Sequence, residues 1–155
     1  MIIETNVTKL LDSKGIKYKL LPHTKPVFTC EEAAKERNVP VDEMIKCILL
    51  VDKEKKYYLA CLTSDKKLNP QKVRELVGCS RLSFAPKNDI EEVLGYQLGA
   101  IPPLLLKTTI PILFDKIIQK KEKVNISSGN PLAGIELDSK TLINLIEPFI
   151  GDISD

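Results

Sequence analysis

The chain has 155 residues, of which 43% are hydrophobic and 28% charged, and this composition is typical of a folded globular protein rather than a disordered one. Its formal net charge of +2 is too small to indicate a nucleic-acid partner by itself. No apolar run approaches the roughly 20 residues of a membrane-spanning helix, and the N-terminus lacks the pattern of a signal peptide. We therefore expect a single soluble, intracellular domain over residues 1–155.

Few residues in the chain can serve as metal ligands or catalytic nucleophiles. The four cysteines contain no C-x-x-C pair, their spacing suits neither a zinc site nor a disulfide framework, and we expect them to be structural. His23 is the one histidine, so a site with several histidine ligands is excluded by counting. Histidine can act as a general base near neutral pH, but His23 lies between prolines in an expected surface loop, and we leave it out of the site.

Periodicity and turn residues predict helices interspersed with strands. In the first half of the chain we predict a helix over residues 5–15, a strand over 16–20, a helix over 30–37, and strands over 44–51 and 57–62. In the second half we predict helices over 70–77 and 87–94, strands over 81–84, 123–127 and 134–137, strand or buried coil over 104–106 and 110–114, and a final helix capped by Asp138 or Ser139. Hairpins outnumber clear βαβ units, which favours a mixed α+β class.

Two helix starts carry specific cap signals. Thr29 is placed to cap the helix over 30–37, with Glu32 at the third helical position to close a capping box. Asn69 precedes Pro70, and proline is favoured at the first position of a helix because its missing N–H is not needed there. These signals make the two boundaries firmer than periodicity alone would.

Lys46 stands inside the apolar run over residues 44–51, which predicts a strand buried on both faces. Lysine is rarely buried unless it is paired or has a function. The alternative is that Lys46 lies at the start of the strand and extends its ammonium to water.

The stretch over residues 95–103 combines conformationally free glycines with two prolines that fix φ and lack an N–H. It cannot be a helix interior, and we expect a stiff loop with Leu98 and Ile101 as apolar anchors. The backbone N–H groups of Gly99, Ala100 and Ile101 are then able to face a ligand with little side chain in the way. The alternative is a tight connection between two buried elements.

Three stretches, in this order, resemble the YbaK/EbsC family of aminoacyl-tRNA deacylases, which are relatives of the editing domain in bacterial prolyl-tRNA synthetases. The first is Ile45-Lys46-Cys47-Ile48-Leu49-Leu50, which is similar to the family's lysine at the head of a central strand. The second is the loop over 95–103, which fits the family's G-x-x-x-P pattern from Gly99 to Pro103. The third is residues 125–129 followed by 134–137, which resembles the family's strand, Ser/Ala-Gly turn and strand.

The resemblance implies a single mixed α/β domain with a mixed, barrel-like central sheet surrounded by helices. It also implies a cytoplasmic trans-editing deacylase that hydrolyses a mischarged aminoacyl ester, with Cys-tRNA(Pro) or Ala-tRNA(Pro) as the expected substrate. The implied partners are the 3′ end of an aminoacyl-tRNA and a prolyl-tRNA synthetase, and neither a metal nor an organic cofactor is expected.

Carried over by position, Lys46 is the functional lysine. We expect it to orient the substrate electrostatically and not to act as a covalent nucleophile. The substrate-binding residues implied by the same resemblance are Gly99, Ala100, Ile101, Pro103, Ser128 and Gly129.

Two positions depart from the family pattern. Pro102 stands where relatives commonly have a small or hydroxyl residue, and Leu105 stands at a place often taken by glycine. Pro102 removes an N–H donor and narrows the conformations of the loop. A non-catalytic tRNA- or synthetase-binding module of the same fold therefore stays open as an alternative, as does a small-molecule-binding domain unrelated to tRNA.

Overall fold

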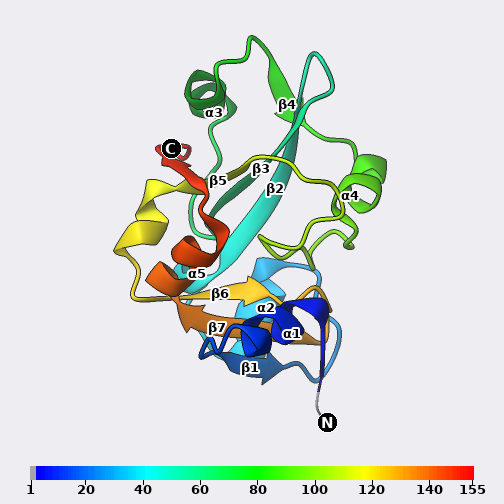
Figure 1. Ribbon diagram of the computed structural model, residues 1–155, viewed down its shortest axis with the longest axis vertical. Coiled ribbons are helices and arrows are strands. Elements are labelled where there is room, and N and C mark those ends of the chain that lie inside the picture. The colour runs from blue at the N-terminus through cyan, green and yellow to red at the C-terminus, as the bar shows by residue number, and fades with distance from the viewer. Residues whose placement is uncertain (1–2) are drawn as a thin grey trace.

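Eight strands form two sheets in residues 3–155, the part of the chain that the computed structural model describes (Figure 1). The smaller sheet is antiparallel and has the order β1 (Lys19–Pro22), β7 (Ala133–Asp138), β6 (Lys123–Ser127). The larger sheet is mixed and has the order β4 (Leu82–Phe84), β2 (Ile45–Asp52), β3 (Tyr57–Thr63), β5 (Ile112–Asp115), β8 (Phe149–Gly151). A bridge between Met44 and Asn125 connects the two sheets where β2 begins.

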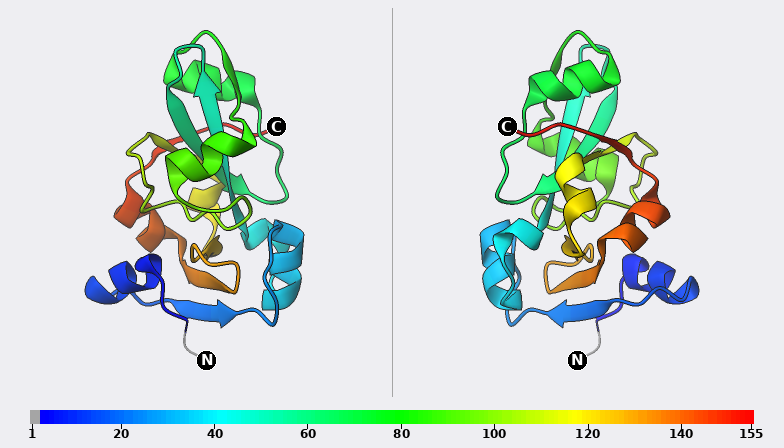
Figure 2. Two further views of the ribbon diagram at one scale, coloured as in Figure 1. Left: turned by 90° about the vertical axis from the view of Figure 1, so that its right-hand side faces the viewer. Right: turned by 90° about the vertical axis from the view of Figure 1, so that its left-hand side faces the viewer.

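Five α-helices and two 3₁₀ helices accompany these strands in the described residues. They are α1 (Asn6–Ser13), α2 (Cys30–Arg37), α3 (Pro70–Val77), α4 (Lys87–Leu94), α5 (Ser139–Ile146), η1 (Val41–Glu43) and η2 (Lys116–Lys120). Helices α1 and α2 lie at opposite ends of β1, whereas α3 and α4 lie beside the far part of the larger sheet (Figures 1 and 2). None of the helices in residues 3–155 has the length and hydrophobicity needed to cross a bilayer.

The helix boundaries follow from their caps. The Thr29 hydroxyl accepts the N–H of Glu32 at 3.1 Å and thereby starts α2, as the capping signal predicted. Asn69 and Asp138 cap α3 and α5 in the same way, each accepting an N–H of the first turn. At the end of α4, Gly95 adopts the left-handed conformation (φ +81°) and turns the chain into the loop over 95–103.

The long hairpin of β2 and β3 forms the centre of the core because both of its faces are covered. Leu49 is buried in the cluster that the smaller sheet, α1 and α5 share, whereas Leu50 is buried in a second cluster beneath α3. A third cluster, with Ala33 and Met44, lies under α2. The prediction of a strand buried on both faces is thus confirmed for the central residues of β2.

The mixed α/β class is confirmed, and the strands are divided between two sheets that meet at Met44. The first strand is shifted: β1 begins at Lys19, not at residue 16. The N–H of Ile16 donates to the Leu11 carbonyl at 3.0 Å, so this residue completes the end of α1 and is not free to pair with β7. Residues 104–106 form no strand, and β8 and the two 3₁₀ helices were not predicted. The division of the chain as one domain over 1–155 stays a prediction, and its first two residues lie outside the described range.

Candidate functional site

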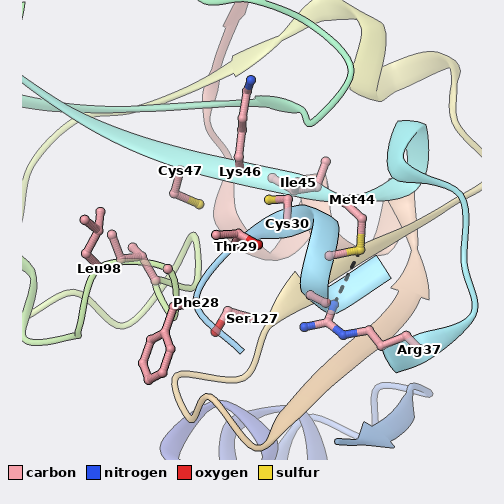
Figure 3. A pocket seen from close by; sticks show the side chains of 13 residues that line it. Phe28, Thr29, Cys30, Arg37, Met44, Ile45, Lys46, Cys47, Leu98 and Ser127 are labelled. Carbon is pink, nitrogen blue, oxygen red and sulfur yellow. Dashed lines mark hydrogen bonds between the residues drawn. The ribbon is translucent and has the colours of Figure 1, made fainter. Parts of the chain in front are cut away.

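A cavity of about 320 Å³ lies between α2, the start of β2 and the loop over 95–103 (Figure 3). Its size is at the lower end of the range for small-molecule pockets. Most of its wall is apolar or sulfur-containing, from residues such as Phe28, Met44 and Cys47. The charged residues that line it are Lys46 and Arg37. An acyl group or another small group with a negative or carbonyl oxygen would match this lining.

Lys46 is the second residue of β2, so the expectation that it stands at the head of a strand is correct in position. Its side chain is half-buried, and its Nζ lies 3.5 Å from the carbonyl oxygen of Ser64, at the outer limit for a hydrogen bond. Figure 3 shows the side chain running away from Phe28 and Arg37. Lys46 forms no ion pair with an acidic residue of the described chain.

The loop over 95–103 forms one wall of the cavity through Leu98, Gly99 and Ile101. Gly99 has φ +89°, and a Cβ at this position would overlap the backbone of Phe28, so the approach of the two segments requires glycine. Ile101 is 7% exposed and anchors the loop, but Leu98 is 51% exposed, so its expected role as an anchor is wrong.

The backbone donors of this loop differ from one residue to the next. The N–H of Ala100 donates to the Gln97 carbonyl at 2.9 Å, which closes a turn and removes this donor from the set expected to face a ligand. The N–H groups of Gly99 and Ile101 make no hydrogen bond with any residue between 3 and 155. Two of the three expected donors are therefore unpaired within the described chain.

The remaining residues implied by the family resemblance lie behind the cavity wall. Ala100 and Pro103 are buried and do not line it. Ser128 is fully buried, and its hydroxyl donates to the Ala133 carbonyl at 2.7 Å across the turn between β6 and β7. A Cβ on Gly129 would lie 2.8 Å from the ring of Tyr96, so this glycine lets the turn pack against the loop over 95–103.

Ser127, one residue earlier than Ser128, lines the cavity instead (Figure 3). Its Oγ accepts the N–H of Gly129 at 3.0 Å, which holds the hydroxyl at the end of β6. Successive side chains of a strand point to opposite faces, so an assignment that is off by one residue selects the wrong face. The sequence places a serine at both positions and offers no means of choosing between them.

The two departures from the family pattern occur where the loop leaves the cavity. Leu105 has φ +55°, in the left-handed region that favours glycine. The hydroxyl of Tyr96 donates to the Leu105 carbonyl at 2.7 Å and helps to hold this conformation. Pro102 is buried beside Gly129 and cannot donate a backbone hydrogen bond.

Arg37 is the charged lining residue that sequence analysis missed. It is the last residue of α2, and burial lowers the pKa of its guanidinium to about 10, which leaves it charged at neutral pH. A signal was present, because Cys30, Ala33 and Ala34 recur at helical spacing and place Arg37 on the same inward face. An arginine on the buried face of a short helix is unusual and marks the position.

His23 is buried at 9% exposure, so the expectation of a surface loop is wrong. Its Nδ1 lies 2.8 Å from the Pro131 carbonyl oxygen, and its Nε2 accepts the Nε–H of Arg37 at 3.0 Å. A carbonyl can only accept, so Nδ1 carries the proton and the ring is neutral in this arrangement. Burial lowers the pKa of His23, which favours the same neutral form.

The four cysteines are free thiols, of which Cys30 and Cys47 line the cavity and Cys61 is buried behind it. Burial raises the pKa of Cys30, so its thiol is protonated at neutral pH and is a poor nucleophile. No group of three or more His, Cys, Asp or Glu side chains in residues 3–155 is arranged to hold a metal ion.

Comparison with known proteins places the chain in one family. The sequence model of the aminoacyl-tRNA editing domain matches residues 24–145. The prolyl-tRNA editing protein ProX of Acetoanaerobium sticklandii is 27% identical over 142 residues, which are 88% of this chain and 86% of that protein. A proline–tRNA ligase of Paraburkholderia phymatum is 32% identical over 133 residues, but the chain spans only 22% of the length of that enzyme.

Solved structures share the fold over nearly the whole chain. The crystal structure of hypothetical protein APE2540 superposes with a TM-score of 0.90 at 28% identity and covers 97% of this chain and 100% of that one. A candidate trans-editing enzyme for prolyl tRNA synthetase superposes with a TM-score of 0.84 at 22% identity and covers 99% of each chain, which supports the fold alone.

Proposed function

The chain belongs to the aminoacyl-tRNA editing domain family, and from this premise we propose that it is a trans-editing deacylase that hydrolyses the ester of a mischarged aminoacyl-tRNA. One observation carries the proposal: a single cavity is lined both by Lys46 and by Gly99 and Ile101 of the loop over 95–103. The names of the similar proteins support proline tRNA as the nucleic-acid partner. We propose Cys-tRNA(Pro) and Ala-tRNA(Pro) as the first substrates to test.

The protein does not need to supply a strong nucleophile, because an aminoacyl ester is already activated towards hydrolysis. In the proposed reaction the oxygen of a water molecule attacks the ester carbonyl, and the bond between that carbon and the ribose oxygen breaks. One proton of the water passes to the departing ribose oxygen, so the products are a free amino acid and a tRNA with its terminal hydroxyl restored. Holding water and ester in contact accounts for much of the rate gain in such reactions.

Negative charge develops on the carbonyl oxygen during the attack, and fixed donors aimed at it lower the barrier. The unpaired N–H groups of Gly99 and Ile101 are suited to this role, because their loop is held by proline rings and by the contact of Gly99 with Phe28.

Lys46 supplies the cation of the proposed site. Its contact with the Ser64 carbonyl is long at 3.5 Å, and its flexible stem allows the ammonium to turn towards a bound ester that offers a stronger acceptor. We propose that Lys46 orients the ester and stabilises the developing charge, and that it forms no covalent bond with the substrate.

A second candidate function is a non-catalytic tRNA- or synthetase-binding module. The loop supports it, because Pro102 lacks an N–H and Leu105 holds a left-handed conformation at a place where glycine would be unstrained. Such a module would retain salt-dependent affinity for tRNA without cleaving it.

The experiment is a deacylation panel with Cys-tRNA(Pro), Ala-tRNA(Pro) and correctly charged Pro-tRNA(Pro). The wild type is compared with Lys46→Ala and with Lys53→Ala, an exposed lysine in the turn that follows the same strand. We expect hydrolysis of one mischarged species, its loss in Lys46→Ala and its retention in Lys53→Ala. Binding of tRNA without cleavage of any species would overturn the deacylase and favour the binding module.

A further inference from the structure

The cavity holds a second cation whose surroundings are all neutral. The Nε of Arg37 donates to His23 at 3.0 Å, and Nη1 lies 3.4 Å from the Ile126 carbonyl and 3.7 Å from the sulfur of Met44. Arg37 forms no ion pair with an acidic residue of the described chain, and its Nη2 makes no hydrogen bond there. A largely buried charge is costly without a counter-ion, and burial lowers the pKa of Arg37 for this reason.

The guanidinium is also fixed in place. A Cβ on Gly134 would overlap the Cζ, Nε and Nη2 atoms of Arg37, so the guanidinium lies against the bare backbone of β7. On its other side His23 accepts from Nε, and the Pro131 carbonyl holds the imidazole in the tautomer that can do so. Three separate segments therefore hold an arginine in one orientation at the cavity wall.

We propose that Arg37 binds an oxyanion of the substrate, a phosphate or carboxylate group, and that His23 is its positioning residue. This inference rests on the proposed function. Within the described chain, the Nη2 of Arg37 is the donor left free for such an oxyanion, and a charge-assisted hydrogen bond of this kind is stronger than a neutral one. No acidic residue of the described chain lines the cavity, and because the Lys46 side chain runs away from Phe28 and Arg37 (Figure 3), Arg37 is the cation that faces it.

Two parts of an aminoacyl-tRNA can supply such a group. Every charged tRNA carries a phosphate in the linkage before its terminal nucleotide. A carboxylate is present only if the attached amino acid is acidic. The two sources share the chemistry that Arg37 recognises, and they are separable because the phosphate stays when the amino acid is removed.

The test measures binding, so that it does not depend on hydrolysis. A fluorescent RNA microhelix ending in CCA is titrated with protein in three forms: unacylated, carrying alanine through a stable 3′-amide, and carrying aspartate through the same amide. The variants are Arg37→Met, which removes the charge, Arg37→Lys, which removes the planar fork, and Gly134→Ala, which displaces the guanidinium and keeps its charge. Lys35→Met is the matched control, because this exposed lysine lies on the same helix.

We expect Arg37→Met and Gly134→Ala to weaken binding about tenfold to a hundredfold, Arg37→Lys to weaken it less, and Lys35→Met to change it less than about twofold. An equal loss on all three probes identifies the phosphate, and a loss confined to the aspartyl probe identifies the carboxylate. Folding of each variant is checked by circular dichroism.

The proposal is overturned if folded Arg37→Met binds all three probes as the wild type does, or if the wild type binds none of them. Failure of the proposed function has a different signature, because a protein that cleaves no mischarged tRNA can still lose affinity for these probes when Arg37 is replaced. His23→Gln provides the positioning test: we expect it to weaken binding in wild-type Arg37 and to have no further effect in Arg37→Met.

Discussion

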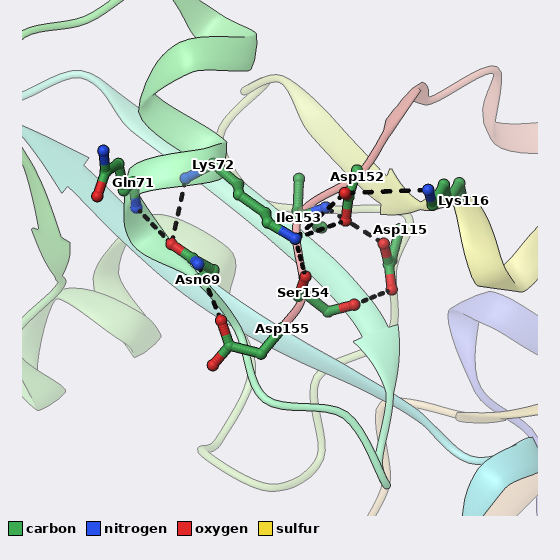
Figure 4. Close-up of polar contacts among 9 residues, drawn as sticks. All are labelled: Asn69, Gln71, Lys72, Asp115, Lys116, Asp152, Ile153, Ser154 and Asp155. Atoms are coloured by element: carbon green, nitrogen blue, oxygen red, sulfur yellow. Dashed lines mark hydrogen bonds and ion pairs between the residues drawn. The ribbon is translucent and has the colours of Figure 1, made fainter.

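Two polar regions of this molecule differ in how far the hydrogen-bonding and ion-pairing capacity of their charged side chains is satisfied within the chain. In one region, residues near the C-terminus contact α3, β5 and η2, and we call this region the clamp (Lys72, Asp115, Lys116, Asp152 and Ser154). Each charged side chain of the clamp has a partner (Figure 4). Lys72 contacts Asp152 at 3.1 Å and the Ser154 carbonyl at 2.7 Å, and the hydrogen bond to Lys72 lowers the pKa of Asp152. The buried carboxylate of Asp115 accepts the Ile153 N–H and the Ser154 hydroxyl.

In the cavity, by contrast, Lys46 and Arg37 form no ion pair within the described chain, and the Nη2 of Arg37 has no acceptor there. Asp115 of the clamp also has neutral partners, but both of its carboxylate oxygens accept a hydrogen bond. Charged side chains that find their partners within the chain stabilise the folded state, because they gain these contacts on folding without a ligand. Charges left with carbonyl, imidazole or sulfur partners gain most when an anion or a polarised carbonyl arrives. The clamp therefore stabilises the end of the chain, and the cavity cations are available for a ligand.

The clamp should give the largest loss of stability when it is broken. Asp115→Ala leaves the buried Ile153 N–H and Ser154 hydroxyl without acceptors, and we expect the free energy of unfolding to fall by about 3 kcal/mol. Urea unfolding measures this value. Deacylation per folded molecule should stay within about twofold of the wild type. An Asp115→Ala variant as stable as the wild type would contradict the stabilising role of the clamp. A variant that stayed folded but lost activity would contradict the assignment of activity to the cavity alone.

The cavity wall should respond to a methyl group at Gly99 more strongly than an exposed glycine does. Gly99→Ala sets a Cβ against the Phe28 backbone at φ +89°, and we expect a loss of about 2 kcal/mol together with loss of deacylation. Gly78→Ala is the matched control, since Gly78 has φ +76° with nothing within 4 Å of the added Cβ.

For that control we expect about 1 kcal/mol of conformational cost and unchanged kinetics. Urea unfolding and deacylation rates are measured on both variants. Equal effects of the two substitutions would show that the contact between Gly99 and Phe28 has no part in the site.

The cavity cations should contribute little to stability. Replacing Lys46 by Met removes a charge that has no acidic partner, so we expect the free energy of unfolding to change by less than about 1 kcal/mol. Arg37→Met also leaves the buried Nε2 of His23 without a donor, so we expect the free energy of unfolding to fall by about 1 kcal/mol, well below the loss in Asp115→Ala. Lys72→Met, within the clamp, should lower it. Thermal and urea unfolding compare the three variants. A large loss in Arg37→Met would assign this residue to the structure and not to a ligand.

The contact of His23 with Arg37 predicts a dependence on pH. Burial lowers the pKa of His23, so the unfolded chain, with a histidine pKa of about 6.5, takes up its proton first as the pH falls. The contribution of His23 to stability is therefore complete above about pH 6.5 and is lost below it, down to the lowered native value. Protonation also turns Nε2 into a donor, which breaks its contact with Arg37.

Unfolding free energies and microhelix affinities at pH 7.5 and 5.5 check this prediction, with His23→Gln as the control. The other charged group near His23 is Glu36, which two hydrogen bonds from Thr24 hold in place. Because the chain has one histidine, the extra decrease in the wild type is specific to it. An identical decrease in His23→Gln would contradict the assignment.

Local chemistry explains why much of the fold could be predicted from the sequence. The start of α2 depends on Thr29 and that of α3 on Asn69, and each cap acts on an N–H within three residues. Gly95 ends α4 in a similarly local way, since its N–H donates to the Glu91 carbonyl four residues earlier. The shift of β1 was not visible, because the end of α1 competes for Ile16 and the register with β7 is set by residues more than 100 positions away.

The site could be predicted only where its residues lie within one segment. The sequence indicates Lys46 and the loop over 95–103 as candidates because each carries an unusual local pattern, and both contribute to the cavity wall. The helical spacing of Arg37 with Cys30 and Ala33 indicates an inward face, but its partners His23, Ile126 and Gly134 lie in three other segments, so the spacing alone does not indicate a site. The choice between Ser127 and Ser128 depends on which face of β6 meets the cavity, and the sequence does not specify this.

The most direct test of the difference between the two regions is the rate at which the protein releases the amino acid from mischarged tRNA(Pro). It is measured for the wild type, Lys46→Ala and Asp115→Ala at equal concentrations of folded protein. We predict a loss of about a hundredfold or more in Lys46→Ala and near wild-type rates in Asp115→Ala. A Lys46→Ala variant that released the amino acid as fast as the wild type would contradict the proposed site.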